Sequence, residues 1–319
     1  MFCINLKDTS PFFCLAAEEF LLKNFEEDIF MLWQSHDTVV VGKHQNALAE
    51  INYPFVRRNN ITVARRISGG GTVFHDKGNV NFAFIKSVRS TQEISFRKFT
   101  EPIVKALASI GITAESSGRN DLLVEGKKVS GNAEHIFKKR VLHHGTLLFN
   151  SDLKNLGEAI RAGEGKYISK AIRSNRSDVV NISDFTEADL DIRGFIRHLF
   201  EFQLNEGNNI HYSFGNKEKA VIEELAARKF SAWEWCFGYS PKYLFRNIFR
   251  EAGKELQIEI QVEKGIIRDC KLEGGLFSDI IKNKIAGELT GRQHRFEEIS
   301  NILELAVKNP SEEMVYAFF

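Results

Sequence analysis

The chain has 319 residues, with 43 lysines and arginines against 42 aspartates and glutamates, and a formal net charge of +1. Proteins that scan nucleic acid normally carry a basic excess, so we expect no nucleic-acid partner, and any anion-binding surface must be local. With 43% hydrophobic and 27% charged residues, the composition is that of a globular protein of about two domains and excludes a disordered or fibrous chain.

Segments up to residue 229 mix helical and strand-like patterns. The spacing of apolar residues predicts a helix over 12–25 and then a hairpin within 28–42. Because helices and strands come in blocks and not in regular alternation, we expect an α+β fold with a mixed, largely antiparallel sheet. The further strands are expected at 61–67, 79–86, 121–124, 127–129 and 143–149, and the further helices at 97–110, 152–162, 186–205 and 216–229.

A second domain is indicated after Pro241. Apolar and polar residues alternate over 256–262, Lys264 and Gly265 supply a turn, and a strand returns over 266–272. Helical patterns follow at 276–286 and 294–307. We therefore expect a large domain over 1–241 and a small α/β C-terminal domain over 245–319.

The cysteines and the apolar segments bear on the compartment. Cys3, Cys14, Cys236 and Cys270 are widely spaced and form no C-x-x-C pair, so neither a disulfide framework nor a zinc site is indicated. No run approaches the ~20 apolar residues of a membrane span, and the apolar segment 11–17 lacks a basic leader. We expect a cytoplasmic protein that contacts no membrane.

The stretch 65–76, Arg-Arg-Ile-Ser-Gly-Gly-Gly-Thr-Val-Phe-His-Asp, carries the strongest functional signal. Three consecutive glycines cost backbone entropy, so their use after a strand predicts a loop whose N–H groups approach an anion such as phosphate. Residues 57–89 include seven basic residues and one acidic residue, Asp76. A glycine-rich turn flanked by surface cations is the alternative. The spacing matches neither of the two commonest nucleotide-binding loops.

Two further stretches combine polar groups with strand patterns. In 118–132, Lys127 and Lys128 follow a tight turn at Glu125-Gly126, and strand geometry points them to opposite faces, so only one can enter a cleft. In 143–149, only one of the two adjacent histidines can face a pocket. The alternatives are solvated lysines and a histidine satisfied by the backbone. No partner stands at zinc-ligand spacing.

Together these stretches resemble the lipoate–protein ligase A family. The motif R-R-x-S-G-G-G-x-V-F-H-D-x-G-N corresponds to 65–79, G-R-N-D-L to 118–122, and K-V-S-G to 128–131. Further matches lie in 37–46, 143–148 and 233–238. The resemblance implies a biotin/lipoate ligase-like catalytic domain over 1–241, followed by the family's accessory domain.

The resemblance also implies a two-step reaction. ATP and lipoate would give lipoyl-AMP and pyrophosphate with the help of Mg²⁺, and the lipoyl group would then pass to a lysine of a carrier. The carriers would be lipoyl domains of 2-oxoacid dehydrogenase complexes or the glycine cleavage H protein, served by a monomeric enzyme. No metal ligand is identified from the sequence.

The family's roles carry over to numbered residues of this chain. Lys128 would be the catalytic cation, in contact with the reacting carboxylate and the α-phosphate. An apolar acyl tail also needs a wall, for which Trp33, Phe74, Phe82 and Val41 are candidates, with core packing as the alternative. With Lys128, the nucleotide would be bound by Arg66, Gly71, Thr72, Val73, Phe74, Asp121, Lys170 and Arg176, and lipoate by Trp33, Ser68, Gly70, His75 and His144.

The segment that would cover the adenylate departs from the family's usual pattern. Over 170–182, Ala171 replaces a glycine and Asp178 replaces a basic residue. We expect 165–181 to be mobile, because Gly163 and Gly165 flank its start. Two other functions stay open: an octanoyl or lipoyl transferase that needs a nucleophilic cysteine and no ATP, and a non-catalytic lipoate-binding protein. A biotin ligase is disfavoured, because its G-R-G-R-x loop is missing.

Overall fold

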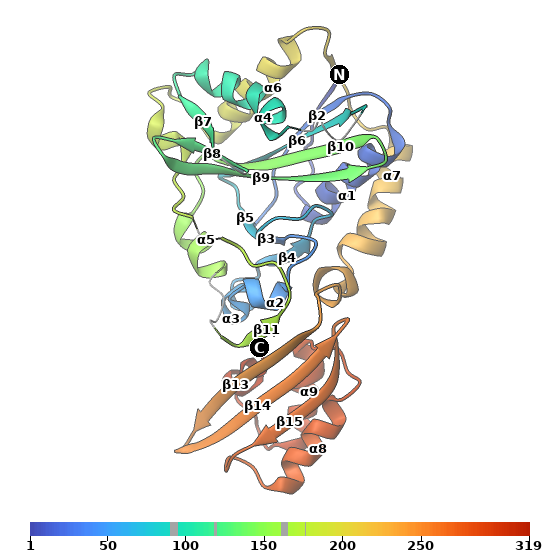
Figure 1. Cartoon of the computed structure of the whole chain (residues 1–319), viewed down its shortest axis with the longest axis vertical. Helices are drawn as coiled ribbons and strands as arrows, with labels where there is room; N and C mark the ends of the chain where they lie inside the picture. Colours follow the sequence, from blue (N-terminus) through green and yellow to red (C-terminus); the bar gives the residue numbers. More distant parts are fainter. Residues whose placement is uncertain (90–94, 118–119, 161–164, 176) are drawn as a thin grey trace. The chain divides into compact units, whose positions relative to one another are not determined.

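The structure is a computed structural model that describes residues 1–89, 95–117, 120–160, 165–175 and 177–319. Internal contacts divide the chain into two compact units (Figure 1). The first unit comprises Met1–Lys43, Thr62–Gly157 and Ser174–Ser231, and the second comprises His44–Ile61, Glu158–Arg173 and Ala232–Phe319.

The first unit is built on one large sheet. Over the described residues this sheet has eight strands in the order β12-β1-β2-β6-β10-β9-β8-β7. β1 pairs in parallel with β2 and β12, and the other pairs are antiparallel, so the expected α+β fold with a mixed, largely antiparallel sheet is confirmed. The strands are β1 Phe2–Asn5, β2 Ile29–Trp33, β6 Asn79–Ser87, β7 Ala114–Ser117, β8 Asp121–Val124, β9 Lys127–Phe137, β10 Arg140–Leu148 and β12 Ile210–His211.

A smaller sheet of the first unit carries the glycine-rich loop. Its described strands lie in the order β4-β3-β5, with β3 (Thr38–Val41) parallel to β4 (Thr62–Arg65) and antiparallel to β5 (Val73–His75). The predicted hairpin within 28–42 is therefore wrong, because β2 and β3 belong to different sheets. Both strands are buried along their whole length, so no polar alternation in the sequence marks their partners.

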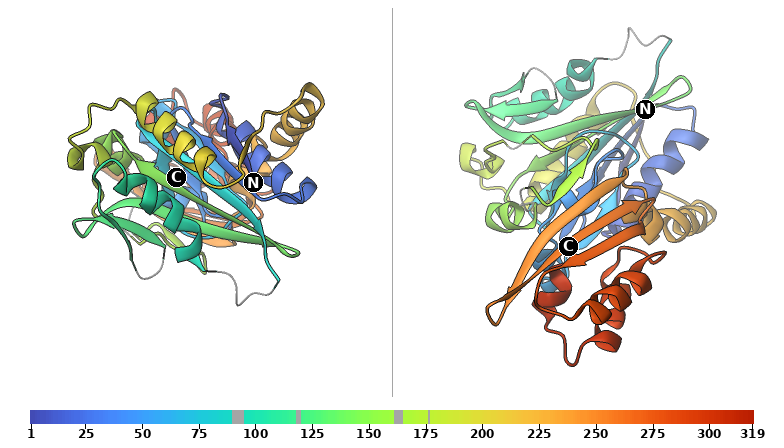
Figure 2. Two further views of the ribbon diagram at one scale, coloured as in Figure 1. Left: turned by 90° about the horizontal axis from the view of Figure 1, so that it is seen from above. Right: turned by 60° about the horizontal axis from the view of Figure 1, so that its bottom comes forward.

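Helices cover both faces of the large sheet (Figure 2). α4 (Phe96–Ala108) and α6 (Ile192–Asn205) pack together over one face, where Phe82 and Phe84 of β6 lie in the core. On the other face, α1 (Pro11–Asn24) contacts β6 and β10. α1 begins where Ser10 accepts a hydrogen bond from Phe13 N. The remaining helical elements are α5 Leu153–Ala159, η2 Ile182–Phe185, α7 Asn216–Leu225 and η3 Ala226–Phe230.

The second unit is an antiparallel sheet with helices. Its described strands lie in the order β11-β13-β14-β15, and the predicted turn at Lys264-Gly265 joins β14 to β15, with both residues at positive φ. The sequence patterns did not predict strands β11 and β13. The strands are β11 Tyr167–Ser169, β13 Tyr243–Glu251, β14 Lys254–Glu263 and β15 Ile266–Glu273, and the helical elements are α2 Ala47–Glu50, α3 Tyr53–Arg58, η4 Glu234–Gly238, α8 Asp279–Leu289, α9 Phe296–Ala306 and α10 Glu312–Tyr316.

The chain terminus is part of the core of the second unit. Phe318 and Phe319 are buried. His294 bonds to the Tyr243 hydroxyl and to the carbonyl of Phe318, at 2.6 Å each, and its ring stacks on Phe319. In both units, none of the described helices is long and apolar enough to cross a membrane.

Gly78, which directly precedes β6, lies close to the backbone of Phe149 and Asn150 after β10. Its carbonyl accepts hydrogen bonds from Phe149 N and Asn150 N, at 3.1 and 3.0 Å. A Cβ at this position would overlap the Asn150 carbonyl group, whereas a Cβ at Gly157 of α5 would meet nothing within 4 Å.

We predict that Gly78→Ala lowers the free energy of unfolding by about 1–3 kcal/mol, the usual cost of overpacking. Gly157→Ala, the matched control, should leave it unchanged or raise it by up to about 1 kcal/mol. Urea unfolding of both variants measures the difference. Equal stability of the two variants would show that residue 78 has room for a side chain.

Candidate active site

Two buried arginines shape the glycine loop. Arg65 is fully buried and donates from Nη1 to the carbonyls of Gly42 and Lys43, at 2.9 and 3.1 Å. Arg66 donates from Nη2 to the carbonyls of Gly69 and Gly71, both at 2.6 Å. Burial lowers the pKa of Arg66 to about 10, although the nearby Glu18 charge opposes this shift. Arg66 therefore orders the loop as a cation, and its direct contact with a nucleotide remains a prediction.

Residues predicted for the acyl site meet around one carboxylate. Ser68 Oγ lies 2.6 Å from His144 Nε2, and His144 Nδ1 lies 2.7 Å from Glu18 Oε2. Trp33 Nε1 donates to the other oxygen of Glu18 at 3.1 Å. All four side chains are buried. The large sheet, α1 and the loop after β4 thus bring Trp33, Ser68 and His144 together.

Glu18 belongs to this buried cluster, although no sequence pattern predicted it. It lies in α1 after the apolar run 11–17, and both Glu18 and its neighbour Glu19 are buried. A buried carboxylate needs donors inside the protein. Acidic residues in a helix with so few other polar groups were the available signal, but the sequence shows no partner for them.

His75 forms another part of this wall. Its ring packs edge-on against Trp33, with centroids 5.3 Å apart, and Nδ1 lies 3.3 Å from Ser35 Oγ. Burial, together with the charge of Arg66, lowers the pKa of His75 to about 3. His143 faces the opposite side of β10, where it stacks on Phe99, so alternation along the strand separates the two adjacent histidines.

Lys128 stands where two predicted nucleotide-binding segments meet. Its Nζ lies 2.9 Å from Asp121 Oδ1. Residues 177–180 run beside β9, since Val180 N donates to the carbonyl of Lys128 at 3.0 Å. Ser174 reaches the glycine loop, where its Oγ accepts from Thr72 N at 2.8 Å. Lys127, in contrast, is exposed. The first unit therefore brings the three motif-bearing stretches together.

Gly70 and the strand β5 complete the loop. Gly70 has φ +85°, a left-handed conformation that favours glycine, and a Cβ there would touch Arg66 Nη2. Gly71 lies against Ser174. Val73 and Phe74 pair with β3, and Phe74 is buried.

Other predicted residues lie elsewhere. Phe82 was expected beside Trp33 in the acyl wall, which is wrong: Trp33 pairs with Asn81, so Phe82 points to the opposite face, into the core under α4. Lys170 belongs to the second unit. Arg176 lies outside the described residues, as do Gly118, Arg119 and Gly163 of the quoted stretches.

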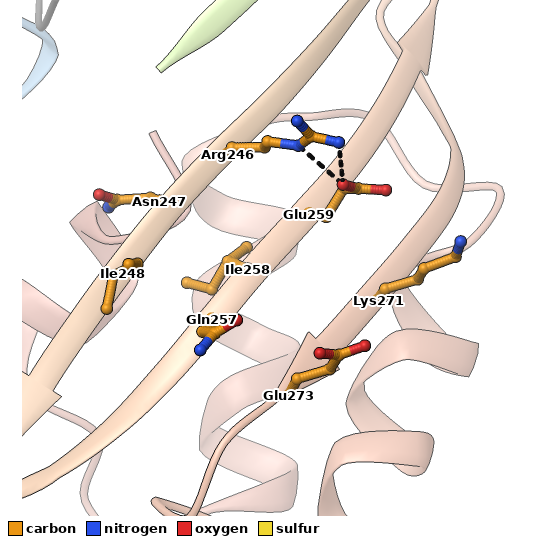
Figure 3. Close-up of a pocket in the computed structure, with 8 residues that line it drawn as sticks. All are labelled: Arg246, Asn247, Ile248, Gln257, Ile258, Glu259, Lys271 and Glu273. Atoms are coloured by element: carbon orange, nitrogen blue, oxygen red, sulfur yellow. Dashed lines mark hydrogen bonds and ion pairs between the residues drawn. The ribbon is translucent and has the colours of Figure 1, made fainter. Parts of the chain in front are cut away.

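The second unit has a pocket of its own on β13, β14 and β15 (Figure 3). Arg246 and Glu259 form an ion pair of 2.8 Å across it. None of the predicted site residues lines this pocket.

Metal ligands are sparse in the described parts of both units. No cluster of three or more histidine, cysteine, aspartate or glutamate side chains could hold a metal ion there. Asp121 is a partly exposed carboxylate beside Lys128. A metal at this site would need most of its ligands from a bound molecule or water.

Comparisons with known proteins agree over nearly the whole chain. The family model for the lipoyl protein ligase A/B catalytic domain matches residues 10–203, and that for the bacterial lipoate protein ligase C-terminus matches 240–313. The lipoate–protein ligase LplJ of Bacillus subtilis (strain 168) is 36% identical, and lipoate–protein ligase 1 of Staphylococcus aureus (strain Mu50) is 38% identical. Each alignment covers 95% of this chain and 93% of the relative.

A solved structure of similar fold supports the same grouping. A crystal structure of lipoate–protein ligase A bound with ATP superposes with a TM-score of 0.65 and 25% identity. The match covers 75% of this chain and 98% of that one.

The depressed pKa of His75 generates a prediction about acid stability. The unfolded histidine has a pKa of 6.5 and the folded one about 3, so the unfolded chain binds more protons between these values. Stability is therefore full above about pH 6.5 and falls as the pH drops. His75→Gln should make the free energy of unfolding less pH-dependent between pH 6 and 4, by up to about 1.4 kcal/mol per pH unit.

Chemical unfolding at several pH values measures this slope. His36→Gln, at an exposed position of the same unit, is the control and should keep the parent slope. An unchanged slope in His75→Gln would mean that His75 titrates normally in the folded protein.

Proposed function

The chain belongs to the lipoyl protein ligase A/B family, and from this premise we propose how its residues carry out the reaction of an ATP-dependent lipoate–protein ligase. The enzyme activates lipoate with ATP as lipoyl-AMP and releases pyrophosphate, and the lipoyl group then passes to a lysine of a carrier protein. The observation that carries the function is the match of almost the entire chain to lipoate–protein ligases.

Activation forces two anions together, and Lys128 is proposed to make this possible. The lipoate carboxylate attacks the α-phosphorus, a C–O–P linkage forms, and pyrophosphate leaves with the electron pair of the broken P–O bond. A positioned cation stabilises the negative charge that builds up in this transition state. Lys128 is a compact cation that is 24% exposed beside Asp121, so it can reach a ligand without leaving its strand.

The glycine loop is proposed to hold the nucleotide. Arg66 donates to the carbonyls of Gly69 and Gly71, so these two oxygens face the guanidinium and not a bound anion. Thr72, Val73 and Phe74 continue this segment, and Ser174 lies against it, where its Oγ accepts from Thr72 N. Asp178, one of the departures from the family pattern, has an exposed side chain and uses its carbonyl group to accept from Lys128 N. The proposed roles of Lys170 and Arg176 rest on the sequence motif alone.

Lipoate is proposed to lie against Trp33, Ser68, Gly70, His75 and His144, with its carboxylate toward Lys128. Trp33 and neutral His75 offer an apolar wall, where each buried methylene of the acyl chain contributes ~0.8 kcal/mol. The hydrogen bonds around Glu18 hold Ser68 and His144 in place along that wall.

Mg²⁺ is proposed to accompany the nucleotide. This ion commonly binds through one or two carboxylates, substrate phosphates and water, which fits a site whose nearby carboxylate is Asp121. When bound, it would neutralise charge on the triphosphate. Asp121 also pairs with Lys128 and so holds that cation in place.

The alternative functions are not favoured. A cysteine-dependent transferase needs a thiol that ionises readily. Burial raises the pKa of Cys3 to about 11 and of Cys270 to about 12, and it raises the pKa of Cys14 well above its ordinary value. A non-catalytic binder would not need Lys128 between the two nucleotide-binding segments.

Further properties remain proposals. The carriers would be lipoyl domains of 2-oxoacid dehydrogenase complexes or the glycine cleavage H protein, and the enzyme would work as a cytoplasmic monomer. Residues 1–241 would perform the chemistry and 245–319 would serve as the accessory domain, a division supported by two separate family matches. Contacts, however, group 44–61 and 158–173 with the C-terminal strands.

The contrast between two adjacent lysines tests the proposed mechanism. Lys128→Ala should slow lipoate-dependent exchange of labelled pyrophosphate into ATP by ~10² to 10³-fold, because the transition state loses a charge-assisted contact. Lys127→Ala removes an exposed charge and should be nearly silent. Circular dichroism confirms folding. If a folded Lys128→Ala enzyme exchanged pyrophosphate within a few-fold of the parent, Lys128 would not be the catalytic cation.

A further inference from the structure

The carboxylate of Glu18 forms hydrogen bonds with the indole of Trp33 and the imidazole of His144. Trp33 Nε1–H can only donate, and it points at Oε1 from 3.1 Å. His144 Nδ1 lies 2.7 Å from Oε2. An ionised carboxylate can only accept, so Nδ1 of His144 must carry its proton. When the imidazole is neutral, Glu18 therefore selects the tautomer that carries its proton on Nδ1.

This choice of tautomer determines the direction of the next hydrogen bonds. With the proton on Nδ1, Nε2 of His144 is an acceptor, and Ser68 must donate its hydroxyl proton across the 2.6 Å contact. Ser68 Oγ then accepts from Arg66 Nε at 3.0 Å. A continuous series of hydrogen bonds, each donating in the same direction, thus runs from Arg66 through Ser68 and His144 to Glu18. It has a positive charge at one end and a negative charge at the other.

This series of hydrogen bonds joins the two proposed substrate sites. Glu18, Trp33 and His144 lie at the proposed lipoate site, and Arg66 holds the carbonyls of Gly69 and Gly71 in the proposed nucleotide loop. All of these residues belong to the first unit. A change of tautomer at His144 would turn the Ser68 hydroxyl toward a different partner, and Arg66 would lose or share an acceptor.

We infer that Glu18 is a positioning residue that fixes His144 as the Nδ1–H tautomer, and thereby directs the Ser68 hydroxyl proton toward His144 and keeps the Ser68 oxygen as an acceptor for Arg66. The inference rests on the proposed function for its substrates. Its structural part, the tautomer, depends only on the hydrogen bonds around Glu18.

An amide cannot replace this carboxylate. Glutamine at position 18 offers one oxygen, whereas Trp33 Nε1–H and His144 Nδ1–H both need an acceptor. If the oxygen serves Trp33, the amide N–H₂ faces His144 Nδ1 and favours the tautomer with its proton on Nε2. The reverse orientation sets two donors against each other at Trp33, which leaves buried groups unsatisfied.

The neighbouring carboxylate supplies a matched control. Glu19 is buried in the same helix and pairs with Lys23 and Lys229, both at 2.5 Å. Among the described residues, Glu19 forms no hydrogen bond or ion pair with Trp33, His144 or Ser68. Glu19→Gln therefore removes a buried charge from α1 and leaves the hydrogen bonds from Glu18 to Arg66 in place.

The experiment compares Glu18→Gln with Glu19→Gln by two measurements. Nitrogen chemical shifts of His144 report its tautomer in the substrate-free protein, and pyrophosphate exchange gives the KM values for lipoate and ATP. Glu18→Gln should move the proton to Nε2 and raise the lipoate KM by ~10- to 100-fold, with a smaller rise for ATP. Glu19→Gln should keep the Nδ1–H tautomer and KM values within two-fold of the parent.

A folded Glu18→Gln protein that keeps the Nδ1–H tautomer and the KM values of Glu19→Gln would overturn the inference. Ser68→Ala provides a second test if Glu18→Gln does not fold: because Glu18 sets the tautomer, His144 should still carry its proton on Nδ1, and a shift to Nε2 would contradict the inference. Absence of lipoate-dependent exchange in the parent would instead contradict the proposed function, and the tautomer measurement would stand apart from it.

Discussion

A guanidinium that is buried away from water must find its acceptors inside the fold, and this requirement governs the site. Arg66 takes the carbonyls of Gly69 and Gly71 as acceptors, so the three glycines bend around the side chain of a residue just before them. Its charge is opposed by Glu18, which is reached through Ser68 and His144. The same hydrogen-bonded set of charged groups therefore shapes the proposed nucleotide loop and lines the proposed acyl site.

Strand geometry delivers the other groups to this centre. Alternation along β10 places His144 toward α1 and sends His143 into the core under α4. On β9, Lys128 lies beside Asp121 and residues 178–180, while Lys127 stays exposed. Stretches far apart in the sequence thus supply a cation, a glycine loop and a buried carboxylate with its hydrogen-bond partners. A positioned cation is what the joining of two anions requires.

Local patterns predicted much of this structure, and they failed where partners are distant. The turns at Glu125-Gly126 and Lys264-Gly265 were predictable because the residues before and after them alternate and the turn residues tolerate positive φ. The hairpin within 28–42 was wrong because fully buried strands carry no mark of their partner. Motifs predicted Ser68, His144 and Lys128 as site residues, and the structure brings Ser68 and His144 into contact. Glu18 was missed because its role depends on contacts with residues 15 and 126 positions away.

The most direct test of the central claim is a crystal structure of the enzyme with a non-hydrolysable lipoyl-adenylate analogue. The account predicts Lys128 Nζ within about 3 Å of both the acyl carbonyl oxygen and an α-phosphate oxygen. It also predicts the phosphate against the glycine loop and the acyl chain along Trp33. An analogue bound away from the glycine loop, with Lys128 still paired only with Asp121, would contradict the claim that these motifs form one adenylating site.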